Sequence, residues 1–361
     1  MRSLRSRLAL LAGLVLLAGL LAGCQTATLL ADGRVLLIAG ERAWIVDPIA
    51  GTRTPIDPPA EIRVAHSATL LPDGTVLLAG GATDEALLGS AELLRTDGVF
   101  VPTGALVTPR SLHTATLLAD GTVLLAGGGQ VSAEQNAPPL ADAEIYDPAS
   151  GTFRATGSLV VPRALHSATL LPDGSVIVIG GGSGDAVIDA VERYDPATGM
   201  FAAAGVLPEG RGVHTATLLP DGRILVAGGL RAKGSGDDVE NVPAASTFLY
   251  DPATGTSVSG PRLGAPRAGH TATLLPDGRG LITGGVDADS EGRASAEILD
   301  PVAGTVTETD ALPKPLAFHA AVALPDGGVL ITGIIQDADA ASVVVIARYD
   351  PATGLFTRLD G

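Results

Sequence analysis

All six histidines of this 361-residue chain stand at the same place in a recurring segment, and most of them follow an arginine by three residues. Imidazole nitrogens bind transition metals, and guanidinium groups bind anions. If the copies were arranged in a circle, these side chains would form a candidate binding ring for an anionic ligand or a metal. The candidate ring consists of Arg63, His66, Arg110, His113, Arg163, His166, Arg211, His214, Arg267, His270 and His319.

A second interpretation of the same residues is structural. A motif that recurs in nearly every copy is typical of scaffold, and buried polar groups need hydrogen-bond partners. Glutamates recur with the ring, at Glu92, Glu144, Glu192 and Glu297, and could pair with the arginines inside each copy. A metal site needs three or four ligands within about 2–2.3 Å of one point, which histidines spread around a circle do not provide. The sequence therefore favours a structural network and predicts neither a metal nor a cofactor.

Other segments of the sequence give weaker evidence for a metal site or a catalytic site. The acidic segments 287–292 and 237–238 carry oxygen ligands that suit calcium, but neither has the spacing of an EF-hand loop. A solvated acidic loop is the expectation for both. No Gly-x-Ser-x-Gly nucleophile motif stands between a predicted strand and a helix. Paired catalytic carboxylates in the loops stay open, because loop geometry cannot be read from sequence.

The segments that must position these residues are seven copies of one unit. They start near residues 25, 66, 113, 166, 214, 270 and 319, with Gln25 at the histidine position of the first copy. An Asp-Gly pair follows in every copy, and an Asp-Pro-x-x-Gly segment follows later in most of them. A repeat length of about 48 residues is close to the ~50 residues of one propeller blade.

Each unit predicts four strands, A to D. In the third copy, strand A begins at His113, and an Asp-Gly pair is expected to supply the positive φ angles of a tight turn. Strand B is apolar throughout and is predicted to be buried on both sides. Strand C is 143–147, and strand D is the short segment after Gly151. Such sheets are stable only when copies pack face to face around an axis, which predicts an all-β, seven-bladed β-propeller of four-stranded antiparallel blades. Because the copies run in frame, the first blade should close the ring by packing against the last.

The paired glycines, followed about 15 residues later by Tyr-Asp-Pro, resemble a kelch repeat over residues 25–361, as in the galactose oxidase superfamily. That resemblance implies a copper site made by tyrosine and histidine, with one tyrosine crosslinked to a cysteine. Here Tyr146, Tyr194, Tyr250 and Tyr349 all stand at one repeat position, and Cys24 is the only cysteine. The crosslinked cofactor therefore cannot form within the propeller, and no enzyme activity is predicted from the resemblance.

Residues 1–23 resemble the signal peptide of bacterial lipoproteins, with three early arginines, an apolar run over 8–20 and the sequence Leu-Ala-Gly before Cys24. The resemblance implies cleavage before Cys24, lipidation of that cysteine, and a domain of residues 24–361 held at a membrane by the lipid. In Gram-negative lipoproteins, a residue other than aspartate after the cysteine usually allows sorting to the outer membrane, and Gln25 stands there. An exported, outer-membrane-anchored monomer is the expectation.

Charge and loop variation complete the functional prediction. The formal net charge of −16 argues against a nucleic-acid partner, because phosphate contact needs a concentrated basic surface. The A–B and C–D turns, on what we call the turn face, are nearly constant, whereas the B–C and D–A loops, on the loop face, vary. We therefore predict a lipid-anchored envelope scaffold that binds a protein or glycan through the loop face. The alternative is an envelope hydrolase or lyase with acidic residues in the same loops. The variable B–C loops are 130–142, 231–246, 286–295 and 335–342.

Overall fold

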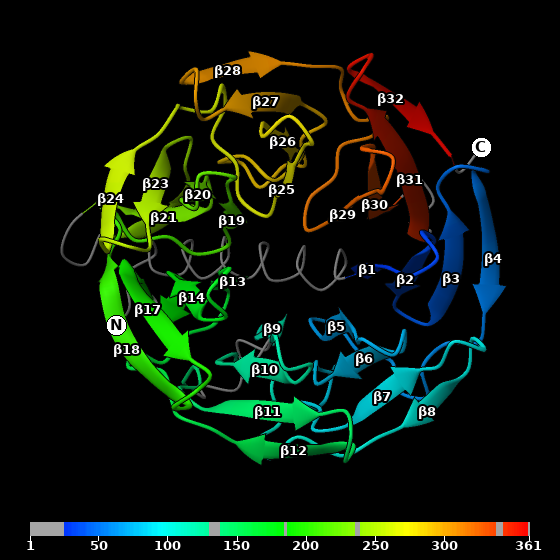
Figure 1. The fold of residues 1–361 in the computed structure, drawn as a ribbon. Coiled ribbons are helices and arrows are strands. Elements are labelled where there is room, and N and C mark those ends of the chain that lie inside the picture. The colour runs from blue at the N-terminus through cyan, green and yellow to red at the C-terminus, as the bar shows by residue number, and fades with distance from the viewer. Residues whose placement is uncertain (1–24, 130–137, 184–185, 235–238, 337–341, 360–361) are drawn as a thin grey trace, which may run out of the picture.

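The computed structural model describes residues 25–129, 138–183, 186–234, 239–336 and 342–359. In this part of the chain, seven four-stranded antiparallel sheets are arranged as blades around a central axis (Figure 1). This confirms the predicted all-β, seven-bladed propeller of four-stranded antiparallel blades. Among the described residues, no helix is long and apolar enough to cross a membrane.

Strands A and B form the inner half of each blade. Strand A is short and is the innermost strand of each blade. Its threonine, serine and alanine side chains are small, which allows the blades to pack closely near the axis. The A strands are β1 (Gln25–Leu29), β5 (Ser67–Leu70), β9 (Thr114–Leu117), β13 (Ser167–Leu170), β19 (Thr215–Leu218), β25 (Thr271–Leu274) and β29 (Ala320–Ala323). The B strands are β2 (Val35–Ala39), β6 (Val76–Ala79), β10 (Val123–Ala126), β14 (Val176–Ile179), β20 (Ile224–Ala227), β26 (Gly280–Thr283) and β30 (Val329–Gln336).

Strands C and D form the outer half, and two extra ribbons extend from B–C loops. The C strands are β3 (Arg42–Asp47), β7 (Ala91–Leu94), β11 (Ala143–Asp147), β17 (Ala190–Asp195), β23 (Thr247–Asp251), β27 (Ala296–Asp300) and β31 (Ser342–Asp350). The D strands are β4 (Thr52–Ile56), β8 (Phe100–Pro102), β12 (Thr152–Ala155), β18 (Met200–Val206), β24 (Thr256–Ser259), β28 (Thr305–Glu308) and β32 (Leu355–Arg358). The ribbons pair β15 (Gly182–Ser183) with β16 (Ala186–Val187), and β21 (Leu230–Lys233) with β22 (Glu240–Pro243).

The core lies between blades and not within them, because strand B is buried on both faces as predicted. In β10, Val123 and Leu125 pack toward the second blade, whereas Leu124 and Ala126 pack toward the fourth. Side chains alternate between the two faces of a strand, so one apolar strand serves two interfaces. Burial of a leucine or valine contributes ~1.5–3 kcal/mol, which makes these interfaces the main source of stability.

The first and last blades close the ring by the same kind of packing. Val35 and Leu37 of β2 share one apolar cluster with Leu330 of β30 and Ile346 of β31. Each blade is built from consecutive strands, so no blade is shared between the two ends of the described chain. Closure by side-chain packing, which the in-frame repeats predict, is confirmed.

The A–B turns differ from the prediction in one detail. In the third blade, the amide of Gly121 donates to the carbonyl of Leu118 at 3.0 Å, and the amide of Thr122 donates to Asp120 Oδ1 at 3.0 Å. Gly121 has a φ of 85°, but Asp120 is not in the left-handed region. Only the glycine supplies a positive φ, as in a hairpin with a three-residue loop, while the aspartate caps the turn through its carboxylate.

The paired glycines after strand B are required by the close approach of the chain that enters strand A. A Cβ on Gly128, whose φ is 98°, would lie 2.5 Å from the carbonyl oxygen of Ser111 and 2.9 Å from Cβ of His113. A Cβ on Gly174, whose φ is 86°, would have no other heavy atom within 4 Å. These two glycines therefore separate the effect of backbone strain from the effect of collision.

We expect Gly174→Ala to cost about 1–2 kcal/mol of unfolding free energy, which is the penalty for a left-handed alanine. Gly128→Ala should cost clearly more than Gly174→Ala, because the blade must also move away from the new methyl group. Urea denaturation of the two variants and the parent protein measures both values. Equal losses of unfolding free energy in the two variants would show that the loop before strand A can move away from the new methyl group without further destabilisation.

Candidate functional site

The arginines of the candidate ring lie inside the blades. Arg110 is fully buried, and its guanidinium donates to the carbonyl oxygens of Gly127 at 2.9 Å and Asp142 at 2.8 Å. Its other terminal nitrogen donates to Glu144 Oε1 at 2.7 Å, and that glutamate is also buried. The ion pair thus ties the D–A loop to the ends of strands B and C in one blade.

The glutamates complete the same network by accepting backbone amides. Glu144 accepts the amides of Val107 at 2.7 Å and Thr108 at 2.9 Å, so both carboxylate oxygens are occupied. Three other blades repeat the buried pair between arginine and glutamate. These pairs are Arg63 with Glu92 at 2.8 Å, Arg163 with Glu192 at 2.5 Å, and Arg267 with Glu297.

Of the other three blades, the first has Trp44 at the glutamate position, and the fifth and seventh depart from the pattern without leaving an unpaired charge at these positions. In the fifth blade, Phe248 stands where the others have glutamate, and Arg211 pairs with Glu209 at 2.8 Å from its own loop. The Arg211 guanidinium also lies 5.0 Å from the centroid of the Phe248 ring. In the seventh blade, Leu316 replaces the arginine and Ala347 replaces the glutamate. Losing both partners together avoids a buried, uncompensated charge.

The histidines lie nearer the axis and connect each blade to the one before it. His166 Nε2 is 3.0 Å from Thr114 Oγ1, and each other histidine meets a serine or threonine hydroxyl of the preceding A strand in the same way. At the histidine position of the first blade, Gln25 Nε2 donates to the carbonyl of Thr332 in the last blade. The remaining contacts are His66 with Thr26, His113 with Ser67, His214 with Ser167, His270 with Thr215, and His319 with Thr271, at 2.9 to 3.2 Å.

Burial keeps these histidines neutral at physiological pH. Loss of water around the ring, together with a nearby arginine cation, lowers the pKa of His66, His113, His166, His214 and His319 to about 3. The pKa of His270 is lowered well below its usual value for the same two reasons. A neutral imidazole offers no positive charge to an anion, so this ring acts through hydrogen bonds between blades.

The residue just before each histidine forms a second ring, which we call the mouth ring. Gly269 is the one glycine among its described members, yet all of them have φ between 51° and 61°, in the left-handed region. Such a conformation is an outlier for a β-branched residue such as Val213. From Leu112 to Phe318, each amide along the ring donates to the carbonyl of the member in the preceding blade, at 2.7 to 3.2 Å. The described members are Ala65, Leu112, Leu165, Val213, Gly269 and Phe318.

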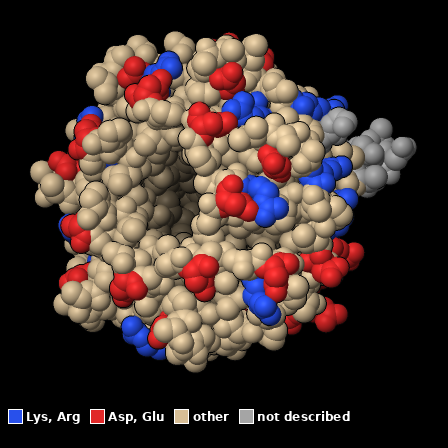
Figure 2. Space-filling model, turned by 45° about the vertical axis from the view of Figure 1, so that its right-hand side comes forward, with Lys and Arg blue, Asp and Glu red and all other residues tan. Residues whose placement is uncertain are grey.

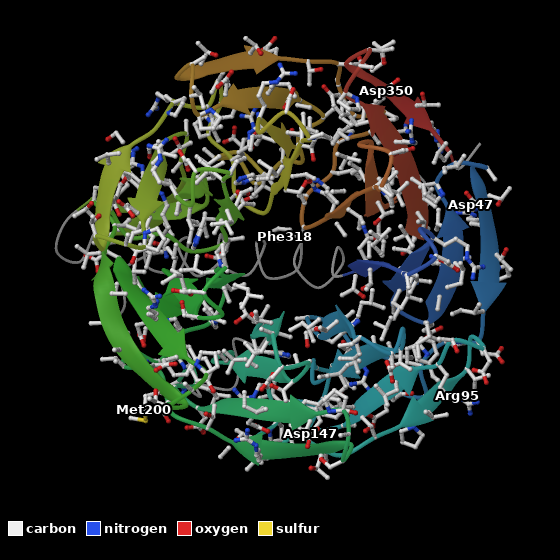
Figure 3. All side chains as sticks on the ribbon, in the orientation of Figure 1. Asp47, Arg95, Asp147, Met200, Phe318 and Asp350 are labelled. Atoms are coloured by element: carbon white, nitrogen blue, oxygen red, sulfur yellow. The ribbon has the colours of Figure 1, made fainter. Side chains whose placement is uncertain are left out.

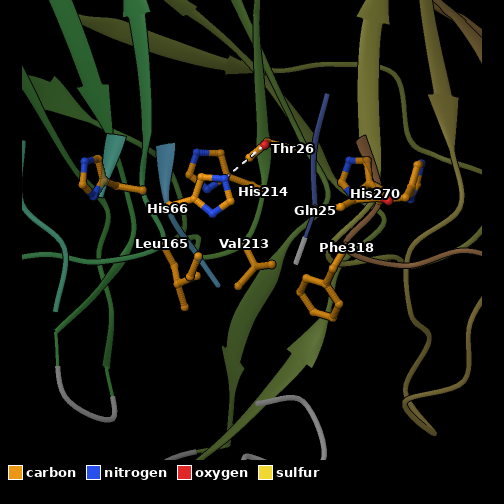
Figure 4. A pocket seen from close by; sticks show the side chains of 12 residues that line it. Gln25, Thr26, His66, Leu165, Val213, His214, His270 and Phe318 are labelled. Carbon is orange, nitrogen blue, oxygen red and sulfur yellow. Dashed lines mark hydrogen bonds between the residues drawn. The ribbon is translucent and has the colours of Figure 1, made fainter. Parts of the chain in front are cut away.

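The described members of the mouth ring other than Leu112 line a cavity of about 290 Å³ at the opening of the central channel. Its side chains project into this opening beside the histidines, as Leu165, Val213 and Phe318 show in Figure 4. Phe318 packs over Gly269, where a Cβ would lie 2.7 Å from the ring. In Figure 2 the visible wall of the central hollow carries few charged side chains, and in Figure 3 Phe318 lies near the axis while Asp47, Asp147 and Asp350 lie at the rim.

The structure therefore divides the candidate ring into two parts. The histidines His66, His166, His214, His270 and His319 line the cavity, together with Gln25 and Thr26. The arginines do not line it, because the ion pairs hold them inside the blades. Sequence reasoning did not identify the mouth ring. A usable signal was present, since the residue before each histidine varies in size from copy to copy.

The remaining sequence candidates contribute no metal site in the described residues, where no group of three or more histidine, cysteine, aspartate or glutamate side chains converges. In the acidic loop 287–292, Asp287 Oδ1 accepts the amides of Asp289 and Glu291 at 3.0 and 3.1 Å, so the loop holds its own shape. Cys24, Asp237 and Asp238 lie outside the described residues.

The tyrosines do not fit a copper site of the galactose oxidase type. Tyr146 is buried in strand C, packs against Phe153 with ring centroids 4.7 Å apart, and its hydroxyl lies 2.9 Å from Thr103 Oγ1 of the preceding blade. Tyr194, Tyr250 and Tyr349 stand at the same outer position and also bond to the preceding blade. None of these tyrosines lines the cavity with the histidines, so tyrosine and histidine do not come together as copper ligands there.

Comparison with known proteins supports the fold alone. No protein-family model matches the sequence, and no curated protein matches it either. Among solved structures, the chain is similar to a fungal alcohol oxidase of the AA5 family, determined in complex with copper. The two share 14% sequence identity with a TM-score of 0.70, over 92% of this chain and 76% of the oxidase. At that identity the likeness shows that this chain is a seven-bladed β-propeller resembling the AA5 copper oxidases in fold.

Proposed function

We propose that this chain is a lipid-anchored binding scaffold of the cell envelope, held by a lipid on Cys24 at the outer membrane of a Gram-negative cell. Its binding surface is the loop face, centred on the mouth ring. The observation that carries this proposal is the division of polar and apolar groups at that face. The repeated arginines and glutamates are held inside the blades, the repeated histidines contact hydroxyls through Nε2, and the side chains that vary between blades project into the cavity.

The repeated glutamates at the loop face are already paired with arginines, which favours a binding function over catalysis. A general acid or base needs a carboxyl or imidazole group that can reach a substrate. Glu144 and its equivalents accept an arginine and backbone amides, and the histidines are neutral and bonded to hydroxyls. The mouth ring, by contrast, offers apolar side chains that range in size from alanine to phenylalanine, which suits recognition of a partner by shape.

A protein partner is favoured over a glycan. Sugar rings pack on exposed aromatic faces, and aromatic residues make up only 3% of this chain. The tyrosines are buried, and Trp44 lies beneath Arg42, whose guanidinium is 5.3 Å from the ring centroid. The ribbons β15–β16 and β21–β22 enlarge the loop face beside the mouth, where a partner protein could contact them.

The partner surface can be tested by photo-crosslinking in cells. A photoreactive phenylalanine analogue at Val160, in a D–A loop and 61% exposed, is expected to give a discrete protein adduct. The same analogue at Val302, in a C–D turn and 89% exposed, is the matched control and should give none. A discrete adduct from the turn face alone would contradict the proposal. Specific retention of the purified domain on a glycan array, without any protein adduct, would indicate that the partner is a glycan.

A further inference from the structure

The fifth blade cannot form the buried ion pair that four other blades share. Phe248 stands at the glutamate position of strand C, and Pro208 stands in the D–A loop where the third blade has Val107. Proline has no amide, so it cannot donate to a carboxylate as Val107 donates to Glu144. The fifth blade therefore keeps the arginine of the repeat, Arg211, without the acid that the repeat normally supplies.

The acid that pairs with Arg211 is Glu209, which belongs to the D–A loop itself. Its Oε2 accepts Arg211 at 2.8 Å, and its Oε1 accepts Arg231 at 3.1 Å. Both contacts are to side chains, whereas Glu144 also accepts two backbone amides. The Glu209 side chain is 35% exposed, against 1% for Glu144. The Glu209 carboxylate can therefore turn into solvent, and Glu144 cannot.

The two arginines around Glu209 differ in burial. The Arg211 side chain is 0% exposed, donates to Ser246 Oγ and to the carbonyl of Gly210 at 3.1 Å, and has a buried Nε without a hydrogen-bond partner. Arg231 is 36% exposed. Two guanidinium groups share one carboxylate, so the group carries a net charge of +1. Because a buried cation without an anion is costly, Glu209 can leave only if another anion takes its place.

This group lies where the two extra ribbons meet the D–A loop. Arg231 belongs to β21, and Gly210 lies against β16, since a Cβ on Gly210 would be 2.8 Å from the carbonyl oxygen of Val187. Gly210 stands directly before Arg211, where the third, fourth and sixth blades have proline. Glycine gives this loop a backbone freedom that proline denies to the others. The site is thus at the loop face, next to a residue that permits Glu209 to move.

We propose that Arg211 and Arg231 form a binding site for a carboxylate of the partner protein, from an aspartate or glutamate side chain, and that Glu209 occupies this site when the partner is absent. The inference rests on the proposed function, because it assumes a protein partner at the loop face. Guanidinium groups match carboxylates in geometry and charge, so the incoming group makes the bonds that Glu209 gives up. Glu209 then acts as a built-in competitor against partners that lack the acid.

The site can be tested with N-acetylglutamate amide, which carries one side-chain carboxylate, and with N-acetylglutamine amide as its neutral control. The carboxylate should raise the melting temperature of Glu209→Gln by about 2 °C or more, because it binds the folded state, and should raise that of the parent less. Glu192→Gln is the matched variant, since it leaves Arg163 without its acid in a pair that is 0% and 1% exposed. It should show no rise. Equal effects of the two compounds on Glu209→Gln, or an equal rise in Glu192→Gln, would overturn the inference.

A second measurement separates this inference from the proposed function and does not depend on the folding of Glu209→Gln. Arg231→Gln changes an exposed residue and should lower the yield of the protein adduct from the photoreactive analogue at Val160 by roughly ten-fold, the loss of one charge-assisted contact. Arg154→Gln, at an exposed arginine of β12, should leave the yield unchanged. An adduct that persists in Arg231→Gln would overturn the carboxylate site alone. Absence of any adduct in the parent would overturn the proposed function as well.

Discussion

Arg110→Leu is expected to lower the free energy of unfolding by about 3–5 kcal/mol, because it leaves Glu144 as a buried carboxylate without its cation. Glu144 is buried, and its remaining partners are the amides of Val107 and Thr108. Glu144→Ala should cost a similar amount, because the buried guanidinium of Arg110 then retains only carbonyl partners. Urea denaturation of each variant measures the loss.

The double variant Arg110→Leu/Glu144→Ala should be more stable than the less stable of the two single variants, although it removes more interactions. The seventh blade already has this combination, with Leu316 and Ala347 at the two positions. Replacing a buried ion pair by apolar groups is often neutral, whereas breaking it is costly. Additive losses in the double variant would show that the pair itself, and not the unpaired charge, accounts for the destabilisation. The surface pair Arg34 and Asp32 is a suitable control, since exposed pairs contribute only about 0–1 kcal/mol.

The propeller is expected to lose stability steeply as the pH falls from 6.5 toward 4.5. In the folded chain, five histidines have a pKa of about 3, whereas an unfolded histidine has a pKa near 6.5. Unfolding therefore takes up protons in this window, so stability is fully present above pH 6.5 and is lost below it. His166 and His319 are each less than 9% exposed, and together they should account for about 3 kcal/mol of this loss between pH 6.5 and 5.

A single substitution tests the origin of this pH dependence. His166→Gln places at the fourth blade the residue that the first blade already has at the same position, Gln25. The variant cannot take up the proton, so the loss of unfolding free energy between pH 6.5 and 5 should shrink by about 2 kcal/mol relative to the parent. The aspartates of the A–B turns whose pKa is lowered, such as Asp120, titrate below this window. Parallel stability profiles for variant and parent would exclude His166 as a source.

Much of the fold could be predicted because the repeat displays its constraints in sequence. Apolar runs such as 76–79 have no polar face, so they required burial on both sides, and only stacked blades arranged around an axis provide it. Strand C was placed at 143–147, where the structure has β11. The Asp-Gly turns were located correctly, but their φ angles were not, because the aspartate acts through its side chain and leaves the positive φ to Gly121 alone.

Sequence alone determined that Arg110, Glu144 and His113 belong to one repeated unit, but it left open whether they face a ligand or one another. Only the tertiary structure decided this, because strands from distant positions bury the arginine between two carbonyls and a carboxylate, while the histidine reaches into the neighbouring blade. The mouth ring depended on tertiary structure even more. The left-handed backbone at Leu165 and Val213 opposes their local preference, and hydrogen bonds from one blade to the next stabilise a conformation that their own sequence would not adopt.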